Sequence, residues 1–102
     1  MKDFSDIQLT EEQRELFDFI EKKAIFMKSK KDDGIKRVGI KVKEKEKKIL
    51  LKIKEMVGGN VNGPYNGFYL WSIKGKMLAE RQVAFVEFFI DRREEFVKFM
   101  NE

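Results

Sequence analysis

Residues 49–75 constrain the fold of this chain more than any other stretch; they read ILLKIKEMVGGNVNGPYNGFYLWSIKG. An apolar helical pattern comes first, and Gly58-Gly59 ends it. Residues 60–65 and 68–74 then read as two strands joined by Asn66-Gly67, the strongest hairpin signal in the chain. The first half repeats this order, because an apolar helix, a strand, an Asp-Asp-Gly turn and a second strand follow one another. A helix and a hairpin, used twice, predict a specific α+β architecture.

Capping and periodicity place the remaining elements. Thr10 and Gln13 have the spacing of a capping box, so a helix is predicted to begin there and to end near residues 21–23. The other expected elements are strands over 24–31 and 35–43, a helix over 45–57, and a helical end over 76–102, with a break or solvated face at DRREE (91–95). The order αββαββα predicts a four-stranded antiparallel sheet covered by helices on one face. We expect a single domain over residues 1–102, with 1–9 as an N-terminal tail.

Composition excludes several kinds of chemistry, since the chain has no histidine and no cysteine. Disulfides, thiolate metal sites, Ser-His and Cys-His nucleophile pairs and most zinc sites are ruled out. Any catalysis would use carboxylates and lysines, most simply around a metal ion, and we expect no cofactor and no small-molecule substrate. The acidic start does not read as a secretory signal, and the uncharged residues 56–73 are too rich in turn residues to span a membrane. An intracellular protein, cytoplasmic or organellar, is expected.

The net charge of +4 is unevenly distributed along the chain. Residues 22–54 hold fourteen bases and four acids, a net charge of +10, whereas residues 1–21 hold seven acids and two bases. A block of this charge attracts polyanions, although a solvated Lys/Glu surface has the same composition. The cations expected to contact phosphates from the first hairpin, on the open face of the sheet, are Lys28, Lys30, Arg37, Lys41 and Lys43. Five neutralised phosphates would give a log–log salt slope of about −4 to −5 on duplex DNA.

The second hairpin presents a different surface. Tyr69 and Trp71 alternate with their neighbours and are predicted to belong to the core. The opposite side of the same strand carries Phe68, Leu70 and Ser72. These side chains are expected either to stack on unpaired RNA bases or to be covered by a protein partner.

The order of these motifs resembles one domain of the LAGLIDADG homing endonuclease family. The similarity covers residues 12–100 and is most specific at ILLKIKEMVGGNV and GFYLWSIKG within residues 49–75. In that family two such domains pack through their motif helices, and a saddle of strands lies in the DNA major groove. An acidic residue at the base of each motif helix holds the metal for phosphodiester cleavage.

The chain departs from the family at the motif itself. Residues 16–24 read LFDFIEKKA, so the metal-binding acid of the family falls on Lys23, which cannot ligate a cation. Glu21 falls on the family's less critical acid, and Lys22 and Lys23 beside it would repel a divalent ion. The small pair that brings two motif helices together becomes Phe17 and Asp18, which we expect to oppose that packing. The resemblance therefore implies a single degenerate domain without a metal site.

Three functional hypotheses remain. The first is a non-catalytic LAGLIDADG-like protein that binds DNA or RNA through its basic hairpin, with a structural role on RNA in a larger particle as one form of it. The second is a protein-interaction module of the same fold that uses its Phe68/Leu70 face. The third is an active homodimeric endonuclease, which would need another alignment of the motif to supply the missing acid.

Overall fold

The computed structural model of the chain describes residues 9–29 and 34–102. Their elements follow the predicted order, with the last helical segment divided in two. The bounds are α1 (Glu11–Lys23), β1 (Ile25–Lys28), β2 (Lys36–Lys43), a 3₁₀ turn η2 (Glu44–Glu46), α2 (Lys47–Val57), β3 (Asn60–Tyr65), β4 (Phe68–Lys74), α3 (Gly75–Phe88) and α4 (Arg93–Asn101). The fold is α+β, as the sequence predicts.

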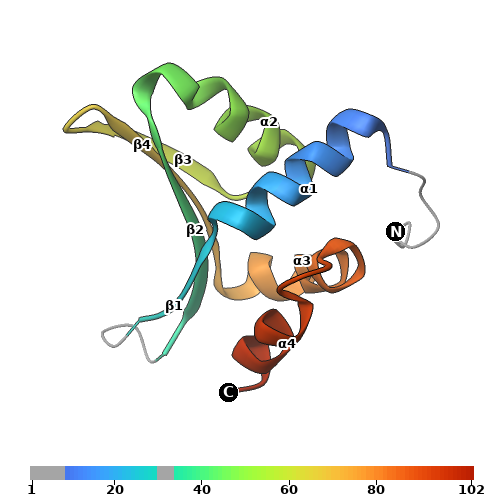
Figure 1. Cartoon of the computed structure of the whole chain (residues 1–102). Coiled ribbons are helices and arrows are strands. Elements are labelled where there is room, and N and C mark those ends of the chain that lie inside the picture. The colour runs from blue at the N-terminus through green and yellow to red at the C-terminus, as the bar shows by residue number, and fades with distance from the viewer. Residues whose placement is uncertain (1–8, 30–33) are drawn as a thin grey trace.

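The four strands form one antiparallel sheet in the order β1-β2-β4-β3. All the helices lie on one side of this curved sheet, and α1 crosses between α2 and α3 (Figure 1). The other side carries no helix among residues 9–29 and 34–102 and is called the open face below. The proline of the second hairpin, Pro64, lies on β3 at the edge of the sheet, where a missing main-chain donor is tolerated.

Local signals account for most of the element boundaries. Thr10 and Gln13 exchange the two hydrogen bonds of the predicted capping box at the start of α1. Asn66 and Gly67 both have positive φ, which the tight turn between β3 and β4 requires. Gly59 has φ +97°, and a Cβ there would lie 2.6 Å from the carbonyl oxygen of Ser72, so only glycine fits this close approach.

Two boundaries differ from the sequence prediction. Strand β1 ends at Lys28, earlier than the predicted residue 31, although residues 30–33 lie outside the described part of the chain. The segment at 44–46 forms a 3₁₀ turn ahead of α2, and no side chain caps either helix start there. The predicted break near Asp91 is confirmed, since the chain turns between α3 and α4.

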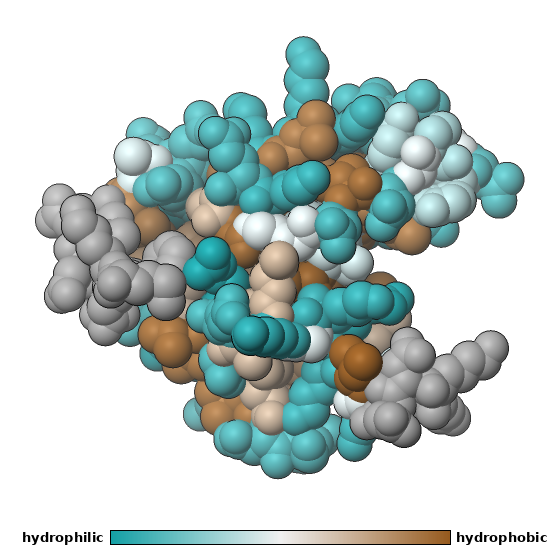
Figure 2. All heavy atoms as spheres, turned by 180° about the vertical axis from the view of Figure 1, so that it is seen from behind, coloured by the Kyte–Doolittle hydropathy of each residue, from teal (hydrophilic) through white to brown (hydrophobic). Residues whose placement is uncertain are grey.

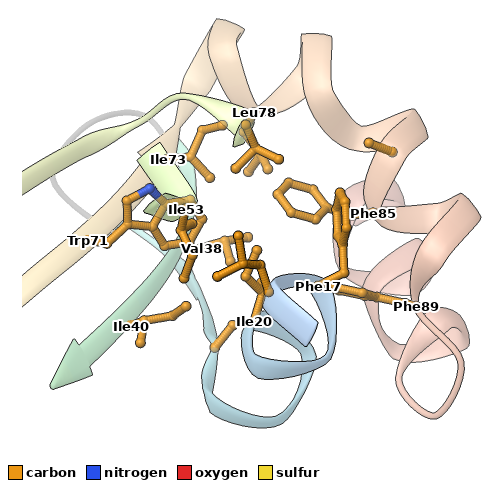
Figure 3. Packing of buried hydrophobic residues seen from close by; sticks show 14 of the residues in the cluster. Phe17, Ile20, Val38, Ile40, Ile53, Trp71, Ile73, Leu78, Phe85 and Phe89 are labelled. Carbon is orange, nitrogen blue, oxygen red and sulfur yellow. The ribbon is translucent and has the colours of Figure 1, made fainter. Parts of the chain in front are cut away.

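The core lies between the sheet and the helices (Figure 3). Trp71 of β4 is fully buried in this core and donates its indole N–H to the carbonyl of Gly58 at 2.9 Å, so the predicted core role of Trp71 is confirmed. Tyr69 packs against the same core but is only partly buried. Three phenylalanine rings pack α3 and α4 together. The centroids of Phe85, Phe89 and Phe96 lie 5.5 to 5.6 Å from one another.

Candidate nucleic-acid interface

Strand register determines which side chains reach the open face. Val38, Ile40 and Val42 are buried against the helices, and alternation turns the intervening residues of β2 to the other side. Lys41 lies opposite Leu70, and Lys43 lies opposite Phe68. The predicted separation of apolar and cationic positions on this strand is therefore confirmed.

The charged residues of the sheet are all positive. Its four strands hold six lysines and arginines and no aspartate or glutamate. Two of the six, Lys28 and Lys36, are paired across β1 and β2 on the side that faces the helices. The cations on the open face are Arg37, Lys41, Lys43 and Lys74. With no acid on these strands to neutralise them, the four give the open face a positive field.

The predicted set of five cations needs one correction, at Lys28. Lys28 has the same parity as Phe26, whose ring packs on Phe96 and Phe99. Lys28 therefore does not point from the open face with the cations of β2, because alternate residues of a strand share one side. Lys30 lies outside the described residues. Lys74 is an open-face cation that was not selected from the sequence. Its position on the open face follows from its pairing with Arg37 across β2 and β4.

The predicted stacking residues do lie on the open face, together with residues of β3. Phe68, Leu70 and Ser72 pair with β3 residues that sequence reasoning did not select: Tyr65, Asn62 and Asn60. The Lys41 ammonium lies 4.4 Å from the centroid of the Phe68 ring, so one face of that ring is already covered by a cation. Phe68 is therefore less available for stacking than its sequence position suggests.

The middle of the open face is hollow. A depression of about 350 Å³ lies across the four strands, and Gly39 of β2 lies at its centre between Ile25 of β1 and Ser72 of β4. Among its lining residues are exposed apolar side chains of three strands, with Ile25 59 % and Tyr65 56 % exposed, together with Met27 and Leu70. In Figure 2 the molecular outline is indented on the side where the β3–β4 hairpin projects.

The C-terminal end of α1 is the place where the family resemblance would put a metal site. Its polar groups are engaged in hydrogen bonds within the protein. Glu21 is 5 % exposed, and one of its carboxylate oxygens accepts the main-chain N–H groups of Ile90 and Arg92 at 2.8 and 2.7 Å. The Arg92 guanidinium donates to the carbonyls of Glu21 and Ala24, both at 2.7 Å. These bonds hold the end of α1 against the turn between α3 and α4.

Arg92, the N-cap residue of α4, also pairs with Glu95 in the first turn of that helix. Two parallel hydrogen bonds of 2.9 and 2.8 Å join the guanidinium to that carboxylate. The hydrogen bonds from Arg92 hold the pKa of Glu95 below its ordinary value; burial opposes this shift, and the charge of Arg92 adds to it. The DRREE segment is thus more than a solvated break, because Arg92 connects three elements.

The metal ion that the LAGLIDADG resemblance implies does not fit the residues at this end of α1. Lys23, which the sequence comparison predicts at the position of the family's acid, is exposed, and an ammonium group has no lone pair to offer a metal ion. The Glu21 carboxylate is committed to main-chain donors, as described above. Within residues 9–29 and 34–102, no three acidic side chains are grouped closely enough to hold a metal ion.

The side of α1 that faces away from the domain does not carry both residues predicted there, Phe17 and Asp18. Phe17 is only 2 % exposed and packs on Phe85 and Phe88 inside the domain, so the expectation that it obstructs a second motif helix is wrong. Asp18 does face outward, where it forms a 3.0 Å ion pair with Lys22. That hydrogen-bonded pair raises the pKa of Lys22 above its ordinary value.

The fold is that of the LAGLIDADG homing endonucleases. I-SmaMI, described as a LAGLIDADG homing endonuclease bound to cleaved DNA, superposes with a TM-score of 0.71 at 18 % identity over 92 % of this chain and 35 % of its own. I-CvuI, solved in complex with its target in the presence of calcium, gives 0.74 at 15 % identity over 86 % of this chain and 62 % of its own. I-TnaI, described as a homing endonuclease, gives 0.67 at 16 % identity over 93 % and 71 %.

These similarities establish the architecture of the chain. The chain spans about a third of the length of I-SmaMI. No protein-family model matches the sequence, and no curated protein does. Among the helices of the described residues, none combines the length and apolarity needed to cross a bilayer.

Proposed function

We propose that this chain binds nucleic acid, DNA or RNA, through the open face of its sheet, without cleaving it. The observation that carries the proposal is the charge of that face, where Arg37, Lys41, Lys43 and Lys74 lie on strands that contain no acid. Phosphate contacts dominate the affinity of nucleic-acid-binding proteins, and strands of this kind are able to enter a groove. The shared architecture adds support, because I-SmaMI is bound to DNA in its crystal structure.

The non-catalytic part of the proposal rests on the end of α1. Lys23 stands at the position where the family has its metal-binding acid, and Lys22 adjoins it. Two ammonium groups repel a divalent cation, and Glu21 is engaged by the N–H groups of Ile90 and Arg92. We expect magnesium to produce no strand cleavage.

A binding titration tests both parts. Fluorescence anisotropy of labelled duplex DNA and of structured RNA is measured over a salt series, with and without magnesium, and the recovered strands are checked for cuts. We expect binding that weakens steeply with salt, and intact strands. Magnesium-dependent cuts made by the wild-type protein would contradict the non-catalytic proposal, and their loss on mutating Glu21 would locate the catalysis at the end of α1.

A second candidate function is a protein-interaction module, favoured by the exposed apolar side chains of Ile25, Met27, Tyr65 and Leu70 on the same face. The titration distinguishes the two, because a module of this kind has no reason to bind polyanions. Absence of binding to every nucleic acid at low salt would reject the first proposal and favour this one.

A further inference from the structure

The hollow at the centre of the open face has the build of a small ligand site. Its volume of about 350 Å³ lies near the lower end of the range of about 300–1,000 Å³ found for ligand pockets. Gly39 of β2 lines the hollow without a side chain of its own and is buried beside the end of the Met27 side chain and the carbonyl of Trp71. A flat group entering here would meet apolar walls from neighbouring strands and polar atoms at the floor.

The walls combine apolar and hydrogen-bonding groups. Ile25 and Met27 stand on the β1 side, while Leu70 and Tyr65 stand on the side of β4 and β3. The Asn62 amide and the Ser72 hydroxyl line the same hollow. An amide offers both donors and an acceptor, and a hydroxyl offers one of each, so together they match the edge of a nucleobase.

Cations flank this hollow along β2. Arg37 and Lys41 are two residues to either side of Gly39, and both line the hollow. Lys43 continues the row, and no acid lies on any of the strands. An apolar hollow between two cations suits a ligand that has a flat ring between two phosphates, which is the repeating unit of a nucleic-acid strand.

We infer that this hollow holds one unpaired base of a single-stranded nucleic acid, with the adjoining phosphates on Arg37 and Lys41. The inference rests on the proposed function and names the form of its ligand. In a duplex the faces of each base are stacked inside the helix, and a protein reaches only base edges and phosphates. The side chains of Ile25, Leu70 and Tyr65 would then stay uncovered, whereas an unpaired base buries them.

The test fills the hollow without changing the charge. In Gly39→Val, the added Cβ would lie 3.4 Å from the flexible end of Met27 and 3.5 Å from the carbonyl oxygen of Trp71, which are tolerable contacts. The φ of Gly39 is not among the positive values of this chain, and valine favours strands. Thermal unfolding followed by circular dichroism checks that the variant is folded.

Binding is measured by anisotropy with a labelled single strand of about 12 nucleotides and with the same sequence as a duplex, within the range of known single-strand site sizes. We expect the wild-type protein to prefer the single strand. We expect Gly39→Val to weaken single-strand binding by about 5- to 100-fold, the loss of one stacked base, and to leave duplex binding unchanged. A second variant, Tyr65→Leu, removes an exposed aromatic ring and does not change the net charge. It should also reduce the preference for the single strand over the duplex.

Controls separate this inference from the proposed function. Val83→Ala changes an exposed apolar side chain on α3, away from the sheet, and should bind both ligands as the wild type does. If both ligands bind equally and neither Gly39→Val nor Tyr65→Leu has an effect, the base site is wrong while the nucleic-acid face stands. If neither ligand binds at low salt, both proposals fail. Should Gly39→Val not fold, Tyr65→Leu decides.

Discussion

Removing two open-face cations should change the salt dependence of binding by a calculable amount. Lys41 and Lys43 are both exposed, and together with Arg37 and Lys74 they make four open-face cations on the strands that the structure describes. At about −0.7 per neutralised phosphate on a single strand, four contacts give a slope of about −2.8. The wild-type protein should then lose about 50-fold in affinity between 50 and 200 mM salt. Lys41→Gln with Lys43→Gln halves the slope to about −1.4, so the loss should fall to about 7-fold.

A matched pair of substitutions makes this experiment specific. Lys48→Gln with Lys54→Gln removes the same net charge from exposed positions on α2, which lies on the helix side. Because exposed charges beyond about 10 Å are screened at 0.1 M salt, this pair should leave the slope near that of the wild type. Anisotropy titrations at four or more salt concentrations give each slope. Equal slopes for the two pairs would refute the assignment of phosphate contacts to β2.

Three further predictions concern the frame that holds the face. Arg92→Met should lower the free energy of unfolding by about 2–3 kcal/mol in urea titrations, because the Glu21 carbonyl and a neighbouring carbonyl lose charged donors; a change below about 0.5 kcal/mol would contradict this role. Glu95→Gln should cost less than about 1 kcal/mol at pH 7, since that carboxylate is exposed. Folding lowers the pKa of Glu95, so the stabilisation by its carboxylate exists at neutral pH and disappears as the pH falls through the folded-state pKa. If the difference in unfolding free energy between wild type and Glu95→Gln is the same at pH 7 and at pH 3, this stabilisation is excluded. Gly59→Ala should destabilise the fold by more than about 1 kcal/mol, because the new Cβ would lie 2.6 Å from the Ser72 carbonyl oxygen at a positive φ, and a melting temperature equal to the wild type's would show that the main chain shifts freely.

Local patterns were sufficient to predict most of the fold. The alternation of β2, the Asn66-Gly67 turn and the Thr10 capping box each depend on residues close together in the chain, and each is present in the structure. The strand order follows less directly, because pairing β2 with β4 requires contacts between distant segments.

The candidate site was predicted less completely, for the same reason. Lys28 was assigned to the wrong side of the ribbon because the burial of Phe26 depends on α4, which is remote in sequence. The bonds between Arg92 and the end of α1 join residues 68 and 71 positions apart, and no local pattern marks them. The hollow around Gly39 depends on the register of three strand pairs, so a single glycine in β2 gave no signal by itself.

Methyl NMR during a titration with a single-stranded oligonucleotide measures the binding face most directly. Exposed methyl groups exist on both sides of the molecule, with Ile25 and Leu70 on the open face and Leu51, Val83 and Ile90 on the helix side. We expect the signals of Ile25 and Leu70 to shift and those of the other three to stay in place. Shifts confined to Leu51, Val83 and Ile90 would contradict binding by the open face of the sheet.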